Sequence, residues 1–342
     1  MKRLLLAFLG LFALNVQAAE QLIVYNWADY LPKEVLTRFT KETGIKVKYS
    51  TYDTNEVMYA KVKTLGGGGY DIVVPSTYYV DRMRREGLLT ELDKSKLPNL
   101  KNLDPKVLNQ PYDPGNAYSV PYLWGSTGIA VRPDRKGNVP DVKGWADLWK
   151  PELKRQLLLI DDVREVFMMA LRVLGHSGNT RNEAEIEAAY NKLKELMPNV
   201  KVFNAESPKD AYLSGEVRLG MIWNGEAYMA QKEMKDLRFV MPTEGPSLWM
   251  DNLVIPKKAP NPEAAHRFID FLLRPEIAKL ITEDVGYTSP NLAAIALLPE
   301  KVRNNRTAYP SAEDLAKGEF QVDVGEALPI YEKYWQRLKA GK

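Results

Sequence analysis

Three of the seven tryptophans in this chain lie next to acidic residues, at residues 26–30 (NWADY), 223–226 (WNGE) and 249–252 (WMDN). An electron-rich indole ring beside a carboxylate is suited to hold an organic ammonium ion. The ring face attracts the cation, and the carboxylate supplies the opposite charge. Because the three stretches are far apart in the sequence, we expect them to converge from different loops. The pattern therefore predicts a site for a small molecule that carries more than one positive charge.

A fourth acidic stretch, residues 161–165 (DDVRE), has two interpretations. Asp162 followed by Glu165 is typical of a helix N-terminus, where such acids cap free backbone amides. Capping explains one acid well, but it leaves a cluster of like charges that requires a cation. That cation could be Arg164 in the same stretch or a bound ligand, and both possibilities stay open.

Paired carboxylates also carry out glycoside hydrolysis, and sugar sites use tryptophan too. Asp162 with Glu165, or Asp29 with Asp251, would then act as acid and nucleophile. No local feature marks one acid as protonated and the other as ionised. We therefore prefer a binding protein with no catalytic residues, and a secreted glycosidase is the alternative.

The composition argues against several other functions. The chain has two histidines and no cysteine, which argues against a zinc or other transition-metal site. The same counts argue against a hydrolase that uses a Ser-His-Asp or Cys-His arrangement. Residues 66–69 (GGGG) precede a predicted strand and lack the Lys and Ser/Thr of a phosphate-binding loop. We therefore expect neither a metal nor a cofactor.

The N-terminus has the pattern of a secretory signal peptide. A basic start at residues 1–3 precedes an apolar run to Leu14 and the small-residue sequence VQA. We therefore expect a signal peptide at residues 1–18 and a mature protein in the periplasm. Loss of Lys2 and Arg3 lowers the formal net charge from +3 to +1. That balance argues against binding to nucleic acid or to an anionic membrane through bulk charge.

Short β-branched runs alternate with amphipathic helices, which is typical of an α/β fold. Strands are predicted at 22–25, 46–50, 70–74, 157–160, 200–203, 218–222 and 253–255, and helices at 32–43, 55–65, 79–86, 164–174, 183–197, 262–273, 275–283 and 324–340. In open α/β sheets the ligand lies beyond the carboxyl ends of the strands. Trp27, Ser76, Tyr78, Asp162 and Trp223 follow such strands, so we expect them at one site.

The length of the mature chain, about 320 residues, suggests two domains rather than one. No flexible linker separates them. We instead expect two extended segments, residues 118–131 (YSVPYLWGSTGIAV) and 247–256 (SLWMDNLVIP), to carry the chain between two lobes as a hinge.

Several motifs in this order resemble the spermidine/putrescine-binding proteins of bacterial polyamine ABC transporters. The resemblance runs from about Leu22 to the C-terminus and is carried by residues 25–30 (YNWADY), 73–79 (VVPSTYY), 121–125 (PYLWG), 161–165 (DDVRE), 222–225 (IWNG) and 249–251 (WMD). It implies a type II periplasmic binding protein, an α/β fold of two lobes. Each lobe would hold a mixed sheet flanked by helices, with the ligand in the interlobe cleft.

The resemblance also implies a domain division and partners. The N-terminal lobe would comprise residues 19–127 with 250–296, and the C-terminal lobe residues 128–249 with 297–342. The protein would be a monomer that captures spermidine or putrescine. It would then deliver its ligand to the subunits of an inner-membrane ABC permease.

Twelve ligand-binding residues are implied by the resemblance: Trp27, Asp29, Tyr30, Ser76, Tyr78, Asp162, Glu165, Trp223, Trp249, Asp251, Tyr287 and Gln321. Asp162 and Glu165 would pair one terminal ammonium, and Asp251 would pair the internal one. Asp29 would help to receive the other end. Ser76, Tyr78 and Gln321 are expected near Asp29, and the aromatic rings would enclose the methylenes.

One stretch departs from the pattern. Spermidine-preferring relatives tend to carry Thr-Glu after the first tryptophan, where this chain has Ala28 and Asp29. Ala28 lacks the hydroxyl, and Asp29 is one methylene shorter than Glu. The choice between spermidine and putrescine therefore depends on this stretch. Because Asp251 would lack a partner without an internal nitrogen, we expect spermidine to be preferred.

Overall fold

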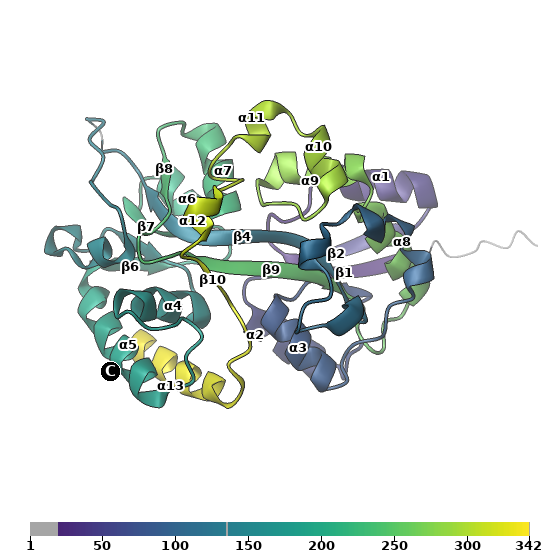
Figure 1. Cartoon of the computed structure of the whole chain (residues 1–342), viewed down its shortest axis with the longest axis horizontal. Coiled ribbons are helices and arrows are strands. Elements are labelled where there is room, and N and C mark those ends of the chain that lie inside the picture. The colour runs from purple at the N-terminus through teal and green to yellow at the C-terminus, as the bar shows by residue number, and fades with distance from the viewer. Residues whose placement is uncertain (1–19, 135, 342) are drawn as a thin grey trace, which may run out of the picture.

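The computed structural model describes residues 20–134 and 136–341 (Figure 1). The predicted signal peptide lies outside the described residues. The described chain forms two groups of helices and strands on either side of two long central strands. We call the group around the N-terminal strands the first lobe and the other group the second lobe.

Three parallel strands, with β1 in the middle, form the sheet of the first lobe: β1 (Gln21–Trp27), β2 (Lys46–Tyr52) and β3 (Ile72–Val73). Its helices are α1 (Lys33–Thr43), α2 (Asn55–Thr64), α3 (Thr77–Arg85), α8 (Pro262–Leu272) and α9 (Pro275–Val285). Alternate residues of a strand face opposite sides of its sheet. Leu22 and Val24 accordingly pack in the core with α1, α8 and α9, whereas Tyr25 packs with α2 and α3.

The second lobe repeats this construction around β5 (Leu157–Leu159), which lies between β6 (Val200–Phe203) and β7 (Leu219–Trp223). Its helices are α4 (Val163–Val173), α5 (Glu183–Leu196), α6 (Pro208–Leu213), α7 (Asn224–Glu233) and α13 (Leu328–Lys339). Leu157 and Leu159 pack with α4, α5 and α13, whereas Leu158 packs with α6 and α7. The strand is therefore buried on both faces.

Two long antiparallel strands, β4 (Ser119–Val131) and β9 (Ser247–Val254), connect the lobes. β9 pairs with β3 of the first lobe and β4 with β7 of the second, so one hydrogen-bonded path runs β2-β1-β3-β9-β4-β7-β5-β6. Short strands β8 (Arg238–Val240) and β10 (Glu319–Phe320) pair with β4 and β9. The two predicted hinge segments are these long strands, and the two lobes share a continuous sheet rather than holding separate ones.

A third connection between the lobes contains α10 (Leu292–Leu297), α11 (Glu300–Arg303) and α12 (Ala312–Leu315). The middle of this connection contacts both lobes. The Thr307 carbonyl accepts a hydrogen bond from the Asn224 amide at 3.1 Å, and the Ala308 carbonyl accepts one from the Thr288 hydroxyl at 2.6 Å. No helix in the described part of the chain is long and apolar enough to cross a membrane.

Helix α3 begins earlier than the sequence predicts, at Thr77 rather than at residue 79. Tyr78 and Tyr79 are therefore neighbours on a helix, so their side chains point in different directions. Tyr79 packs on the ring of Tyr59 at 5.3 Å, while Tyr78 lines the cavity described below.

A close approach in the central strands gives a prediction for stability. A Cβ atom on Gly125 of β4 would lie 2.6 Å from the Trp249 ring of β9 and would also meet the Asn224 side chain. We expect Gly125→Ala to lower the free energy of unfolding by about 1–3 kcal/mol through overpacking, measured by thermal unfolding. Trp249→Phe in the same chain should recover part of the loss, and strictly additive losses would contradict this contact.

Candidate ligand-binding site

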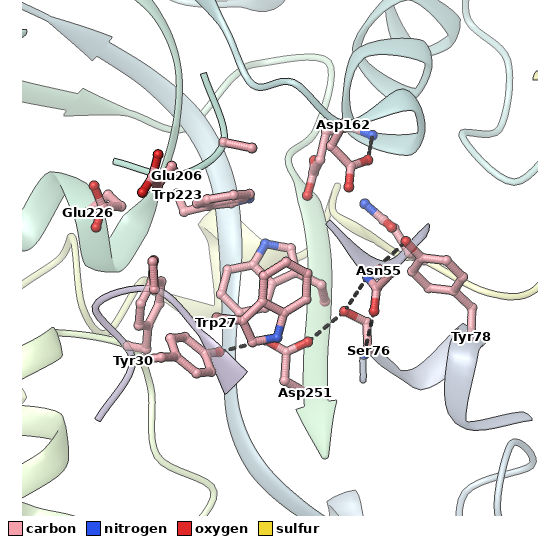
Figure 2. A pocket seen from close by; sticks show the side chains of 16 residues that line it. Trp27, Tyr30, Asn55, Ser76, Tyr78, Asp162, Glu206, Trp223, Glu226 and Asp251 are labelled. Carbon is pink, nitrogen blue, oxygen red and sulfur yellow. Dashed lines mark hydrogen bonds between the residues drawn. The ribbon is translucent and has the colours of Figure 1, made fainter. Parts of the chain in front are cut away.

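A cavity lies between the lobes, at the carboxyl ends of β1, β3, β5 and β7 (Figure 2), and the space between its protein atoms, with the adjoining open solvent included, is about 550 Å³. Eleven of the twelve predicted residues line it: Trp27, Tyr30, Ser76, Tyr78, Asp162, Glu165, Trp223, Trp249, Asp251, Tyr287 and Gln321. The parallel strands of both lobes thus end at one place. That these residues contact a ligand stays a prediction.

Asp251 of β9 sits in a chain of hydrogen bonds inside the cavity (Figure 2). Its carboxylate accepts hydrogen bonds from the Tyr30 hydroxyl at 2.7 Å and the Ser76 hydroxyl at 2.6 Å. The Asn55 amide donates in turn to the Ser76 hydroxyl at 3.0 Å and to the Tyr78 hydroxyl at 3.1 Å. Asp251 is 4% exposed and forms no ion pair with any described residue. It is therefore a fixed, buried carboxylate without a counterion.

Asp162 and Glu165 form a second acidic position at the start of α4. The Oδ1 atom of Asp162 accepts hydrogen bonds from the backbone N–H groups of Arg164 at 2.8 Å and Glu165 at 3.0 Å, so the capping interpretation is correct for this oxygen. Glu165 is buried, and its Oε2 atom has no hydrogen-bond partner among the described residues. Helix capping therefore does not use the second carboxylate.

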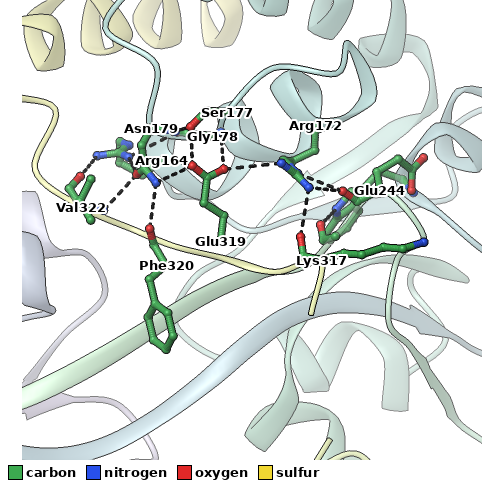
Figure 3. Close-up of polar contacts among 12 residues, drawn as sticks. Arg164, Arg172, Ser177, Gly178, Asn179, Glu244, Lys317, Glu319, Phe320 and Val322 are labelled. Carbon is green, nitrogen blue, oxygen red and sulfur yellow. Dashed lines mark hydrogen bonds and ion pairs between the residues drawn. The ribbon is translucent and has the colours of Figure 1, made fainter. Parts of the chain in front are cut away.

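Arg164 does not pair with these acids. Its guanidinium donates to the Val322 carbonyl at 3.1 Å and to the Asn179 side chain at 2.8 Å (Figure 3), and it lies 5.4 Å from the centre of the Tyr78 ring. Within the described part of the chain, it makes no ion pair with Asp162 or Glu165. Of the two cations that the sequence allows, only a ligand is left to neutralise the pair directly.

Aromatic rings from both lobes form the walls of the cavity. Trp27 and Trp223 approach from opposite lobes, with ring centroids 6.5 Å apart and an interplanar angle of 68°. Trp249 and Tyr287 meet edge to face at 5.4 Å. The Trp27 indole donates to the Val74 carbonyl at 2.9 Å, which holds its ring in one orientation. Such fixed rings can enclose methylene groups or a cation.

Gln321 reaches the cavity from the segment that follows β10. Glu319 ties this segment to the second lobe by accepting a hydrogen bond from the Asn179 amide at 3.0 Å (Figure 3). The Gln321 side-chain amide donates to the Ser247 hydroxyl at 3.0 Å, and the Gln321 backbone carbonyl accepts from the Thr77 hydroxyl of α3 at 3.2 Å. The segment therefore contacts both lobes beside the cavity.

Asp29 is the predicted residue that is not among those lining the cavity. It lies in a turn after β1 with a left-handed φ of 47°, its side chain is 51% exposed, and it forms an ion pair with Lys209 of the second lobe. Ser76 and Tyr78 bond instead to Asn55 at the beginning of α2. The Asp29 carboxylate is thus directed toward α6 and pairs with Lys209, and a contact of Asp29 with the end of a ligand stays a prediction.

Five further residues line the cavity without being among the twelve predicted ligand-binding residues: Ala28, Asn55, Ala205, Glu206 and Glu226. Glu226 lies in the tryptophan-acid stretch at residues 223–226, so a usable signal was present. Asn55 is visible in the sequence only as a helix start. Among the described residues, no group of three or more His, Cys, Asp or Glu is arranged to hold a metal ion.

Burial dominates the electrostatics of the cavity, because removal from water disfavours an ionised carboxylate. It raises the pKa of Asp251 to about 7 and the pKa of Glu226 to about 7. The pKa of Glu165 rises to about 8, first through burial and then through the charge of Asp162. These carboxyl groups therefore carry protons up to about neutral pH, and a bound cation would favour their ionised forms.

A cavity of rings and unpaired acids, enclosed by two α/β lobes, defines a solute-binding protein rather than an enzyme. The chain belongs to the bacterial extracellular solute-binding proteins, whose family profile matches residues 34–309. It is 56% identical to the spermidine/putrescine-binding periplasmic protein of Escherichia coli and 55% identical to that of Salmonella typhimurium. Each match covers 98% of this chain and 96% of the relative.

A solved structure titled putative spermidine/putrescine ABC transporter, from Listeria monocytogenes, has the same fold. It is 41% identical, superposes with a TM-score of 0.89, and covers 94% of this chain and 100% of that one. These comparisons confirm the predicted family, α/β fold and periplasmic location. They also favour the predicted binding protein over the glycosidase alternative.

The raised pKa values predict how stability depends on pH. Buried carboxyl groups with a pKa near 7–8 keep protons that the unfolded chain has already lost, so the ligand-free protein should lose stability as the pH rises from about 5 to about 8. Thermal unfolding at several pH values would measure this. Glu165→Gln, which cannot ionise, should make the fall shallower, and an equally steep fall in that variant would contradict the assignment.

Proposed function

We propose that this chain is the periplasmic receptor of a polyamine ABC transporter and that it binds spermidine in preference to putrescine. The observation that carries the proposal is the pair of buried acidic positions without a counterion, Asp251 and the Asp162–Glu165 pair, between aromatic walls. The names of its relatives support the same ligands.

The chemistry of the cavity favours an organic polycation over other solutes. A buried carboxylate is unfavourable unless a cation with good hydrogen-bonding geometry compensates it. A divalent metal would need several oxygen ligands around one point, whereas these acids are distributed between different elements. A neutral amphiphile would satisfy the rings but leave the acids unpaired. A polyamine supplies ammonium groups for the acids and methylenes for the rings.

In the proposed complex, Asp162 and Glu165 bind one terminal ammonium and Asp251 binds the internal one. Trp27, Trp223, Trp249, Tyr30 and Tyr287 would enclose the methylenes, and Ser76, Tyr78 and Gln321 would complete the polar contacts. Asp29 would help to receive the other end of the ligand at the edge of the cavity. Because Asp251 serves the internal nitrogen, a triamine gains one ion pair that a diamine lacks.

We also propose that the lobes, residues 20–127 with 250–296 and residues 128–249 with 297–341, close on the ligand around β4 and β9. Closure would exclude water and so strengthen each ion pair. The receptor would act as a monomer and present the closed form to the subunits of an ABC permease. No nucleic acid takes part.

The first test is calorimetric titration of ligand-stripped protein with spermidine and then putrescine, in one buffer at one ionic strength. We expect one-to-one binding of both, with spermidine tighter. Tighter putrescine would reverse the proposed preference, and absence of heat from both would overturn the function.

Asp251→Asn tests the proposed role of the central acid. The loss of a charge-assisted hydrogen bond costs about 1.5–3 kcal/mol, which corresponds to roughly 10- to 150-fold in affinity. We expect a loss of this size for spermidine and a smaller one for putrescine. Equal weakening of both ligands would contradict the pairing of Asp251 with the internal nitrogen.

Asp161 and Asp162 are adjacent acids, so the same substitution at each position gives a test variant and its matched control. Asp162 lines the cavity, whereas Asp161 pairs with Lys339 at 2.6 Å outside it. Asn remains a good N-cap, so Asp162→Asn should preserve α4 while it weakens both ligands about tenfold or more. Asp161→Asn should leave both affinities within about twofold, since exposed ion pairs contribute little. Similar losses in the two variants would contradict the assignment.

A further inference from the structure

We propose that Lys209 is a specificity-determining residue whose side-chain ammonium pairs with Glu226, an acid that lines the cavity, in place of a ligand ammonium, while Lys209 and its second partner Asp29 lie beside the cavity rather than in its lining. Its positive charge thereby lowers the ratio of the putrescine to the spermidine dissociation constant. This inference rests on the proposed polyamine function and concerns the end of the site opposite Asp162.

Lys209 bridges the two lobes at this end. From α6 in the second lobe, its Nζ atom forms an ion pair with Asp29 of the first lobe, a second ion pair with Glu226 at 3.5 Å, and a hydrogen bond to the Ser207 hydroxyl at 3.0 Å. Its backbone N–H also donates to Glu226 at 3.1 Å. The side chain is only 14% exposed. The ammonium is therefore held in one place by several contacts.

Within the described part of the chain, the Lys209–Glu226 ion pair is the one ion pair that an acid lining the cavity forms. Asp162, Glu165 and Asp251 form none. Glu206, also at the Lys209 end, is exposed, so water screens its charge. The acidic positions are thus unequal: those near Asp162 and Asp251 lack a cation, whereas the Glu226 position already has one.

The Lys209 side chain has the chemistry of a polyamine end. A lysine side chain is a primary ammonium on a flexible four-carbon stem, which matches the aminobutyl arm shared by putrescine and spermidine. Without Lys209, Glu226 would line the cavity as a buried acid without an ion pair. With Lys209 in place, a third ligand ammonium meets a like charge and a partly neutralised pair of acids.

A second interpretation is that Lys209 only holds the lobes together. A latch of that kind stabilises every closed complex equally, so its loss would weaken diamine and triamine by the same factor. A residue that imitates a ligand ammonium acts mainly on the ligand that is long enough to reach Glu226 from the Asp162 end, which is the triamine. The ratio of the two dissociation constants therefore separates the interpretations.

The test is calorimetric titration of Lys209→Met, which keeps the length of the chain and removes its charge. We expect the ratio of the putrescine to the spermidine dissociation constant to rise about tenfold, with spermidine bound more tightly, because a nearby like charge has been removed. Lys209→Arg, which retains the charge, should keep the ratio within about twofold. Lys201→Met, at an exposed lysine whose ammonium bonds to the Glu216 carbonyl, is the matched surface control.

An unchanged ratio, or equal weakening of both ligands, would overturn the role of Lys209 while leaving the proposed function intact. Absence of polyamine binding by the unaltered chain would overturn both. Thermal unfolding monitors the fold of each variant. If Lys209→Met does not fold, Lys209→Gln provides a second neutral side chain that can still hydrogen-bond to Glu226, with the same expected rise in the ratio.

Discussion

The burial of carboxylates without an internal counterion is the constraint on which the rest of this structure depends. Asp251 and Glu165 are almost fully enclosed, and neither forms an ion pair within the described residues. The Tyr30 and Ser76 hydroxyls hold Asp251 in place by hydrogen bonds, but such bonds do not remove the cost of desolvating a charge. These carboxyl groups therefore keep their protons up to about neutral pH, and a cation that binds beside them would compensate the charge of their ionised forms.

The surrounding fold keeps these acids in position. Leu157 and Leu159 anchor β5 on one face and Leu158 on the other, so the turn that presents Asp162 starts from a strand buried on both faces. β9 brings Trp249 and Asp251 into the cavity from a strand paired on both sides. A rigid framework reduces the entropy lost when a ligand is bound, which favours affinity.

Much of this arrangement is predictable from sequence patterns. The strand and helix periods give most elements within a few residues, and the rule that ligands lie beyond strand ends brings Trp27, Ser76, Asp162 and Trp223 together. The family resemblance adds residues from distant segments, such as Tyr287 and Gln321. The position of Asp29 is not predictable, because it depends on a left-handed turn and on Lys209, whose sequence neighbours give no functional signal. Short elements such as α6 and β10 are stabilised by tertiary contacts and have no clear period of their own.

The continuous sheet has a mechanical consequence. β4 and β9 form a two-stranded antiparallel ribbon between the lobes, and ribbons of this kind twist more readily than wider sheets. In the closure proposed above, the lobes would move relative to one another while the ladder between β4 and β9 stays intact. Torsion about the ribbon would then change the opening of the cavity without breaking backbone hydrogen bonds, and the two strands would keep one register in the open and closed forms.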